Sequence, residues 1–437
     1  MPASKSVIEA AWTWTGEQFQ RDVQIVVDRH GRIEKLIPAG RPATRRLPGQ
    51  ALLPGFVNAR SLSFQRGMRG RGEGFPVGVG NLWTWREAMY DLVLELDSTS
   101  LYALASRAFR EMRAAGITTV GEVQLLHHTL GEVDYAYDEV ILRAAATSGI
   151  RIALLEAYVH DGGYGLPPND AQKRFASPSR GQFWRQVDAL EAARDPRTQS
   201  IGVAAYGLRT VPLVELAELH AETRRRDLVF HVPAEEQRHD VDQCVAHYGK
   251  RPLELLLDTI KIDRRVTVAH ATHATPDDLA RFFAAGGNVC LAPLTEHNLG
   301  DGLIHTESIR GVSEHLALGT AGNGRISMLE EMRALEYAHR VRAESRGIFR
   351  DESGRVSKTL LEIATRGGAR ALGLETGRIY PGYWADFTAI DLTHPSIEGC
   401  DEQSILDAVV LGAGDEIITA TCVGGKWTEH REARLQT

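Results

Sequence analysis

Apolar and polar residues alternate along this chain in patterns typical of strands and of helices, and the pattern changes near residue 51. From there on, short apolar runs are interleaved with stretches whose apolar residues recur every three or four positions, as in 101–115, 213–226 and 276–285. Eight strand and helix pairs are the number found in a closed parallel barrel, so the pattern predicts an α/β fold, a (β/α)8 TIM barrel. The first β segment lies within 52–66, and the others are 117–123, 152–158, 201–206, 228–232, 266–270, 288–292 and 315–319.

The two ends of the chain differ from this middle part. Residues 1–50 contain β-like pieces at 8–14, 23–27 and 33–37, which are separated by turn signals such as 28–31. The tail returns to β-like alternation from residue 377 onward. We therefore predict a small β-sandwich domain made from residues 1–50 and 375–437, beside a barrel domain of residues 51–374.

Composition and charge narrow the class of protein. The 437 residues are 43% hydrophobic and carry a net charge of -7 without a basic stripe, so no nucleic-acid partner is indicated. The N-terminus lacks the apolar segment of a secretion signal, and no run approaches the roughly 18 apolar residues of a membrane span. The four cysteines, at 244, 290, 400 and 422, are far apart and form no C-x-x-C pair, which argues for a reducing compartment and against a zinc cluster built from thiolates. We expect a cytoplasmic protein with no membrane partner.

In such a barrel, the residues that follow each strand face the active site. The stretch 52–66 is an apolar strand that runs into an Arg-bearing loop and then a helix. The later strand ends are rich in His and acidic residues, but they contain no H-x-H or H-E-x-x-H spacing that would bring two imidazoles onto one metal ion. His127 and His128 are adjacent and would point to opposite faces of an extended segment, so we interpret them as structural.

Several motifs together resemble the formimidoylglutamate deiminases of the amidohydrolase superfamily. The resemblance runs in unbroken order from about residue 50 to about residue 390, and it implies a (β/α)8 barrel, a β-sandwich built from both termini and a homodimer. The motifs are PGFVN at 54–58, FQR at 64–66, LWTWREAMY at 82–90, LRTV at 208–211, HATH at 270–273, TEHNLGDG at 295–302 and EEMRALEY at 330–337.

The resemblance also implies a divalent ion, usually zinc, that activates a water molecule. Its ligands in the family are two histidines after strand one, a histidine after strand five and an aspartate after strand eight. Here the matching positions hold Arg60, Leu62, Pro233 and Ala321. Arg60 would bring a fixed positive charge to the place of the ion, so we predict no metal and no other cofactor.

Other residues that match the family are retained. Gln65, Arg86 and Arg209 match positions that hold the substrate's amide and carboxylates, and a guanidinium suits a carboxylate by its planar donors. Glu236 and His270 match the groups that transfer protons and contact the amidine. Two further family positions are replaced, a histidine by Tyr206 and a tyrosine by Leu125. The predicted catalytic set is Glu236, His270, Arg60 and Tyr206, and the predicted substrate-binding set is Gln65, Arg86 and Arg209.

Three hypotheses follow. The first, which we favour because the carboxylate-binding residues are retained, is a metal-independent enzyme that acts on an amide, imine or amidine group of a small amino-acid-derived carboxylate. The second is a non-catalytic pseudoenzyme that binds a ligand or partner. The third is a zinc deiminase with an unorthodox site drawn from His231, His270, His273 and His297.

Each candidate residue also has a structural interpretation. Arg60 could neutralise Glu236 in place of the ion, and Arg86 and Arg209 could tie barrel loops together. His270 could be a hydrogen-bonded core histidine. The aromatic cluster that contains Trp83 is most simply explained by packing or subunit contact.

Overall fold

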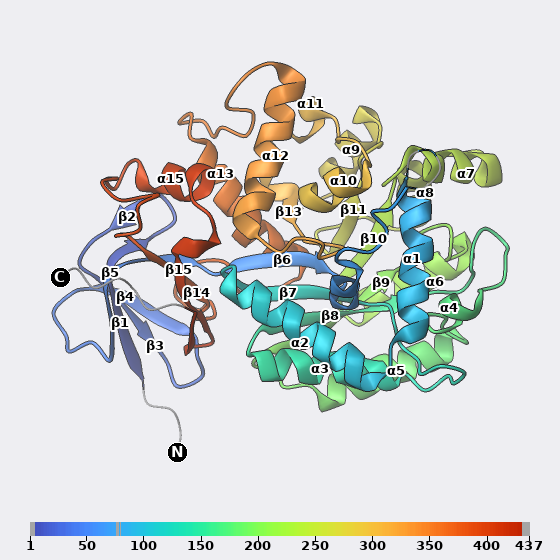
Figure 1. Ribbon diagram of the computed structural model, residues 1–437, viewed down its shortest axis with the longest axis horizontal. Coiled ribbons are helices and arrows are strands. Elements are labelled where there is room, and N and C mark those ends of the chain that lie inside the picture. Colours follow the sequence, from blue (N-terminus) through green and yellow to red (C-terminus); the bar gives the residue numbers. More distant parts are fainter. Residues whose placement is uncertain (1–4, 76–77, 79, 431–437) are drawn as a thin grey trace.

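The centre of the molecule is a parallel eight-stranded barrel (Figure 1), in a computed structural model that describes residues 5–75, 78 and 80–430. The strands lie around the barrel in chain order, and a parallel bridge between Ser61 and Ala321 joins the two ends of the sheet. The predicted α/β barrel is confirmed. Its strands are β6 (Phe56–Ser61), β7 (Ile117–Gln124), β8 (Arg151–Tyr158), β9 (Gln199–Ala205), β10 (Phe230–Ala234), β11 (Val266–His270), β12 (Asn288–Leu291) and β13 (Leu316–Leu318).

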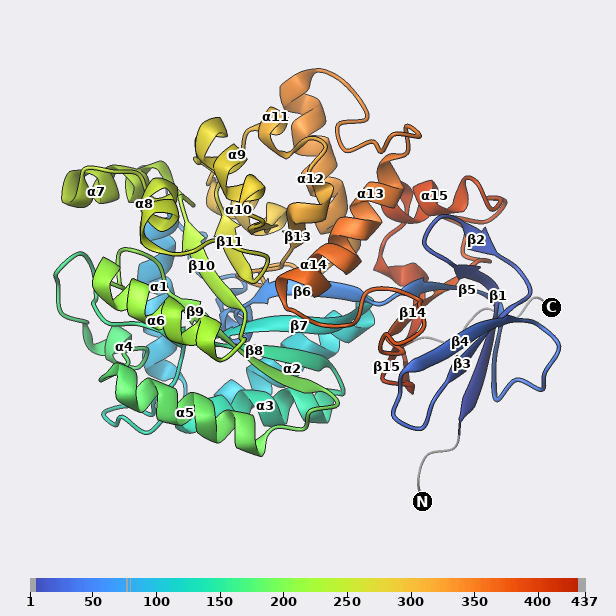
Figure 2. The same ribbon diagram turned by 180° about the vertical axis from the view of Figure 1, so that it is seen from behind.

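Helices cover the outside of the barrel (Figures 1 and 2). The three helical stretches expected from periodicity are α2 (Ser98–Ala114), α6 (Leu213–Arg225) and α9 (Pro276–Ala284). No helix in the described ranges is long and apolar enough to cross a bilayer. The other helices are η1 (Ser63–Met68), α1 (Leu82–Glu95), α3 (Ala136–Ser148), α4 (Asp170–Lys173), α5 (Arg180–Ala193), α7 (Arg238–Tyr248), α8 (Pro252–Thr259), α10 (Pro293–Leu299), α11 (Thr306–Ile309), η2 (Ser313–His315), α12 (Met328–Ala343), α13 (Val356–Glu362), η3 (Ile363–Gly367), α14 (Gly368–Ala371), α15 (Ile405–Gly412) and η4 (Asp415–Ile417).

A buried hydrogen-bond network joins the first strand of the barrel to the segment after the last. The Asn58 amide donates to Thr320 Oγ1 at 2.7 Å, and the Thr320 backbone N–H donates to Asn58 Oδ1 at 3.0 Å. Asn323 Nδ2 in turn donates to Ser61 Oγ and to the Leu62 carbonyl, both at 3.0 Å. These groups are buried, so leaving any of them unpaired would cost free energy. The network therefore fixes the end of β6, where the chain enters the pocket.

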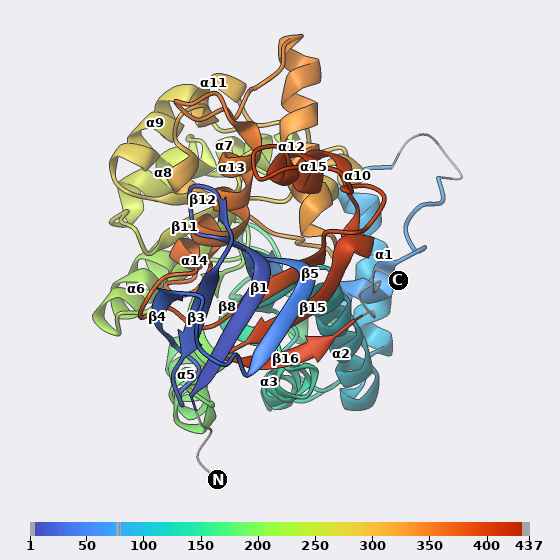
Figure 3. The same ribbon diagram turned by 90° about the vertical axis from the view of Figure 1, so that its left-hand side faces the viewer.

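The two ends of the chain form a second sheet of eight strands. Its order is β16-β15-β14-β5-β1-β3-β4, with β2 paired to β1. Figure 3 shows the N-terminal strands in blue beside β15 and β16 in red, so segments far apart in the sequence are neighbours. The strands are β1 (Ser6–Trp14), β2 (Phe19–Gln20), β3 (Val23–Val27), β4 (Ile33–Pro38), β5 (Arg45–Pro54), β14 (Phe387–Asp391), β15 (Ile418–Val423) and β16 (Lys426–Glu429).

A buried ion pair connects this sheet to the barrel. Arg151, at the start of β8, donates from Nε to Asp386 Oδ2 at 2.7 Å and from Nη2 to Asp386 Oδ1 at 3.0 Å. The guanidinium also lies over the ring of Trp384, with 4.3 Å between its carbon and the ring centroid. Two parallel hydrogen bonds and a stacked ring hold the arginine in one orientation.

Glu122 supports the turn that leads into the pocket. It lies in β7, is 1% exposed, and accepts a hydrogen bond from the backbone N–H of Ser63. Its second oxygen is buried and has no hydrogen-bond partner in the described part of the chain. Burial raises the pKa of Glu122 to about 7, and interactions with Ser61 and Ser63 offset only part of this effect.

We expect Glu122→Gln to remove a pH dependence of the free energy of unfolding. The pKa of Glu122 in the folded state lies above its ordinary value of 4.5, so the folded state binds more protons and wild-type stability falls as the pH rises from about 4.5 to about 7. Urea unfolding should find the variant similar to wild type at low pH and more stable, by up to about 3 kcal/mol, once the wild-type carboxylate is charged. Glu254→Gln, at a partly exposed position in α8, is the control. Parallel pH profiles for Glu122→Gln and wild type would contradict the assignment.

Candidate functional site

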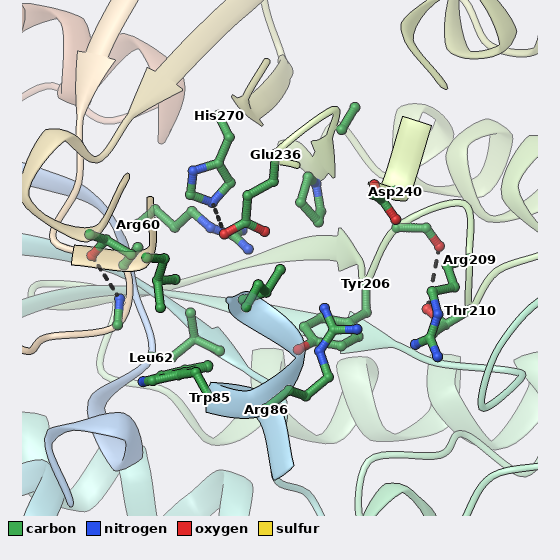
Figure 4. Close-up of a pocket in the computed structure, with 18 of the residues that line it drawn as sticks. Arg60, Leu62, Trp85, Arg86, Tyr206, Arg209, Thr210, Glu236, Asp240 and His270 are labelled. Carbon is green, nitrogen blue, oxygen red and sulfur yellow. Dashed lines mark hydrogen bonds and ion pairs between the residues drawn. The ribbon is translucent and has the colours of Figure 1, made fainter. Parts of the chain in front are cut away.

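The carboxyl ends of the barrel strands open into one pocket (Figure 4). The residues predicted from the sequence for catalysis and for substrate binding all line it, although they come from separate parts of the chain. Their proximity is therefore a product of the fold, while their roles stay predictions. Arg60 lies in β6, Gln65 in η1, Arg86 in α1, Tyr206 and Arg209 after β9, Glu236 after β10 and His270 at the end of β11.

The positions at which the resemblance implies metal ligands also meet on the wall of this pocket. Arg60, Leu62, Pro233 and Ala321 all line it. The side chains of leucine, proline and alanine have no atom that can bind a metal, and arginine donates hydrogen bonds without accepting any. At these positions the residues do not fit a divalent cation.

Arg60 is a buried cation whose hydrogen-bonding capacity is only partly used. The residue is 4% exposed, and its Nε and Nη1 are buried without a hydrogen-bond partner in the described ranges. Figure 4 shows the side chain running toward His270 and Glu236. Burial lowers the pKa of the Arg60 guanidinium, while nearby groups that include Glu236 raise it. An arginine stays protonated under these conditions, so the pocket contains a permanent positive charge.

His270 lies between two carboxylates. Its Nδ1 is 3.1 Å from Glu296 Oε1, and its Nε2 is 3.7 Å from Glu236 Oε1. Burial lowers the pKa of His270, but Glu236 and Glu296 together raise it above its ordinary value. The contact with Glu296 orients the ring and leaves Nε2 directed at Glu236, as the dashed line in Figure 4 indicates. This arrangement suits proton transfer between His270 and Glu236.

Asp301 brings a further carboxyl group to this cluster. Its Oδ1 accepts a hydrogen bond from Gln237 at 2.6 Å, while its Oδ2 is buried without a partner in the described residues. Burial and the nearby Glu236 raise the pKa of Asp301. Ligand atoms of Glu236, His270 and Asp301 lie within 4.8 Å of one another, a donor set that could hold a divalent cation. The fixed charge of Arg60 acts on both Glu236 and His270 and opposes a second cation there.

A second group of potential ligands, His127, Asp138 and Glu156, is fully buried and does not line the pocket. His127 Nδ1 is 2.9 Å from Asp138 Oδ1, and its Nε2 is 2.8 Å from the carbonyl of Ala157. Both ring nitrogens therefore have partners within the chain. This geometry supports the structural interpretation of His127.

The histidines suggested for an unorthodox zinc site are not brought together as a set. Of His231, His270, His273 and His297, only His270 belongs to either group of potential ligands found in the described ranges. His231 Nε2 pairs with the Ala371 carbonyl at 2.9 Å, and burial lowers the pKa of its ring to about 4. A zinc site that used His270 would need Glu236 and Asp301 instead of the other three histidines.

Arg86 and Arg209 are organised by the indole ring of Trp83. The guanidinium carbon of Arg86 lies 4.2 Å from the Trp83 ring centroid, and that of Arg209 lies 4.9 Å from it. Burial and the charge of Arg86 lower the pKa of Arg209, so the two cations repel each other where they share the ring. An anion placed near both would relieve this repulsion. This end of the pocket is suited to carboxylates.

Sequence reasoning did not assign two pocket residues, Trp83 and Asp240, to the site. Neither follows a strand directly, since Trp83 is in α1 and Asp240 is in α7. The signal for Trp83 was its place three residues before Arg86, because residues at this spacing lie on one face of a helix. Burial and the charge of Glu236 raise the pKa of Asp240 to about 6, against the opposing effect of Arg86 and Arg209.

Backbone strain is concentrated around the pocket. His270 has a φ of 70°, Glu235 a φ of 55° and Ala321 a φ of 37°, all in the left-handed region that disfavours residues other than glycine. Such conformations cost free energy and persist only where the surrounding structure enforces them. They lie at the ends of β10 and β11 and just after β13, where side chains must be directed into the pocket.

Known proteins resemble this chain along most of its length. Residues 51–428 match the model of the amidohydrolase family. The chain is 32% identical over 418 residues to formimidoylglutamate deiminase of Pseudomonas aeruginosa, and the match covers 94% of this chain and 92% of that protein.

Solved structures agree with this assignment. An amidohydrolase from Brucella melitensis superposes with a TM-score of 0.86 and 28% identity, over 96% of this chain and 94% of that chain. An adenosine deaminase from Xanthomonas campestris, solved with bound zinc, has a TM-score of 0.78 and 22% identity, over 96% and 92% of the two chains. The second likeness is one of fold alone.

We expect Trp83→Leu to weaken the binding of glutarate, a simple dicarboxylate, by about tenfold. The substitution removes the ring that holds Arg86 and Arg209, and a cation–π contact contributes about 0.5–2 kcal/mol. Isothermal titration calorimetry measures the affinity. Trp184→Leu is a matched control, because Arg226 lies 4.5 Å from the Trp184 ring outside the pocket. Equal affinities for wild type and Trp83→Leu would show that the ring does not position the two arginines.

Proposed function

This chain belongs to the amidohydrolase family, and from that premise we propose that it hydrolyses a C–N bond of a small amino-acid-derived carboxylate without a bound metal ion. The observation that carries the proposal is the buried guanidinium of Arg60, which stands at a position where the resemblance implies a metal ligand and acts on the pair of His270 and Glu236. The curated relative from Pseudomonas aeruginosa supports a hydrolytic C–N reaction. Carboxylate recognition by Arg86 and Arg209 is supported by their shared contact with Trp83.

The proposed reaction needs a base, an acid and a group that stabilises negative charge. Glu236 takes a proton from water as the water oxygen bonds to the substrate carbon. Arg60 stabilises the negative charge that develops in the transition state, with donors already oriented in a buried site. The C–N bond then breaks, and the departing nitrogen takes a proton from His270. The proton held by Glu236 passes to His270, whose Nε2 lies 3.7 Å away, and restores the starting state.

A second candidate function is a zinc-dependent deiminase with an unorthodox site. It is favoured by one observation, the convergence of Glu236, His270 and the unpartnered Asp301 Oδ2 within one small volume. Zinc would there supply an activated water molecule. Arg60 argues against this candidate, because its charge lies beside the same cluster.

We expect Glu236→Gln to lower the rate of hydrolysis by about 100-fold or more while substrate binding is retained, because the amide cannot accept the proton. The assay follows hydrolysis of N-formyl, N-carbamoyl, N-formimidoyl and N-amidino amino acids, with Glu254→Gln as a control. Metal analysis of the same protein should find far less than one metal ion per chain.

Other results would separate the alternatives. Stoichiometric zinc, whose removal by a chelator abolishes turnover, would replace the first proposal by the second. Compounds that raise the melting temperature but are never hydrolysed would contradict both, and would indicate a pseudoenzyme that binds its ligand.

A further inference from the structure

We propose that Arg60 makes this pocket selective for an uncharged N-acyl, N-formyl or N-carbamoyl group, whose carbonyl oxygen accepts a hydrogen bond from the guanidinium, and that it excludes cationic amidinium and guanidinium groups. The inference deepens the proposed function by naming the class of reacting group. It rests on the proposed function in one respect, the binding of the ligand's carboxylates by Arg86 and Arg209. It does not depend on turnover, because it is a statement about binding.

Arg60 has hydrogen-bond donors that no protein group in the described ranges uses. Its Nε and Nη1 are donors that are buried and have no partner within the described residues. A buried donor without a partner costs free energy, and an acceptor that fills this need binds with a corresponding gain. The carbonyl oxygen of an amide or ureide is such an acceptor. A protonated amidine presents only N–H donors to the same place, so the Arg60 donors stay without an acceptor.

The pocket wall carries more positive than negative side chains. Among the side chains that line it, the guanidinium groups are those of Arg60, Arg86 and Arg209, while the carboxylates are those of Glu236 and Asp240. Permanent positive charge therefore exceeds negative charge in the lining. Amidines and guanidines are strong bases and carry a positive charge at neutral pH. Bringing one beside Arg60 places two like charges together in a buried site, where screening by water is weak.

Glu236 does not cancel this effect for a cationic ligand. Its carboxylate is already near the His270 ring, with 3.7 Å between Oε1 and Nε2, and its charge also acts on Arg60. A cationic ligand would thus compete with two protein groups for one carboxylate. A neutral carbonyl group makes no such demand and leaves Glu236 free to bind water.

The positions of the arginines determine the direction in which the ligand binds. Arg86 and Arg209 both lie over the Trp83 ring. Figure 4 shows these two arginines on one side of the pocket, while Arg60 extends toward His270 and Glu236. A ligand that satisfies both places has carboxylate at one end and an acylated nitrogen at the other. N-acyl and N-carbamoyl amino acids have this arrangement.

A matched pair of ligands tests the proposal. N-formyl-L-glutamate and N-formimidoyl-L-glutamate differ only in whether the terminal group is a neutral carbonyl or a cationic amidinium. Calorimetry with the full-length protein should find the formyl compound bound at least about tenfold more tightly. The pair N-carbamoyl-L-glutamate and N-amidino-L-glutamate should give the same order.

Variants of Arg60 connect this preference to one side chain. Arg60→Gln removes the charge and should reduce the preference to near unity, whereas Arg60→Lys keeps the charge and should retain most of it. Arg107→Gln, which removes an exposed charge from α2, should leave the preference unchanged. If Arg60→Gln does not fold, the comparison of Arg60→Lys with wild type, together with the wild-type ligand pairs, still decides the matter.

The outcomes separate this inference from the proposed function. Equal or tighter binding of the cationic compounds by wild-type protein, or no binding of either neutral compound, overturns the inference. Tight binding of the neutral compounds without hydrolysis supports the inference while the proposed catalysis fails. Hydrolysis of the formimidoyl compound with tighter binding leaves C–N hydrolysis standing and overturns the selectivity assigned to Arg60.

Discussion

Closure of the barrel between β6 and β13 is the constraint on which the site depends. The carbonyl of Arg60 accepts hydrogen bonds from the backbone N–H groups of Thr320 and Ala321, at 3.0 and 2.9 Å. Gly319 permits this approach, because a Cβ atom there would lie 2.8 Å from the Arg60 carbonyl oxygen and 2.9 Å from its Cβ. The backbone of Arg60 is thus tied to the segment that follows β13, and its side chain enters the pocket from a rigid position.

The electrostatics of the pocket follow from this placement. A cation with fixed charge is held near Glu236, while Glu236 and Glu296 both lie close to the His270 ring. Burial and the nearby Glu236 raise the pKa of Asp301, which lowers its tendency to add a further negative charge to this cluster. Arg60 can therefore stabilise the cluster and bind a ligand at once, and the structural and functional interpretations of this residue are compatible.

Much of the fold could be predicted from the sequence, because each strand and helix has its own pattern of apolar and polar residues. Apolar runs such as 117–123 and 152–158 became β7 and β8 with bounds shifted by one residue at most. The return to β-like alternation in the tail led us to predict that the two ends of the chain form one domain. The position of β5 between β1 and β14 could not be predicted in this way, because β5 and β14 are separated in sequence by the whole barrel. Periodicity reports which side of an element is buried, and it carries no information about which distant element covers that side.

The same distinction applies to the site. Arg60, Glu236 and His270 could be found because strand ends in a barrel face one opening. Trp83 and Asp240 belong to the helices α1 and α7, so a search of strand ends does not find them. Arg86, which is also in α1, was assigned only through the resemblance. The cluster of Glu236, His270 and Asp301 was concealed for another reason. Glu236 follows β10, His270 ends β11 and Asp301 follows α10, so these three residues meet only in the folded barrel.

The order of strands in the terminal sheet also has a consequence for synthesis of the chain. β5 emerges from the ribosome early, but its neighbour β14 follows only after every barrel strand has been translated. Until then, one edge of β5 has unpaired backbone groups, and the apolar residues that later pack beneath β14 and β15 are exposed to solvent. A nascent chain in this state can pair wrongly with neighbouring chains, so the terminal sheet is open to aggregation for as long as the barrel is being translated.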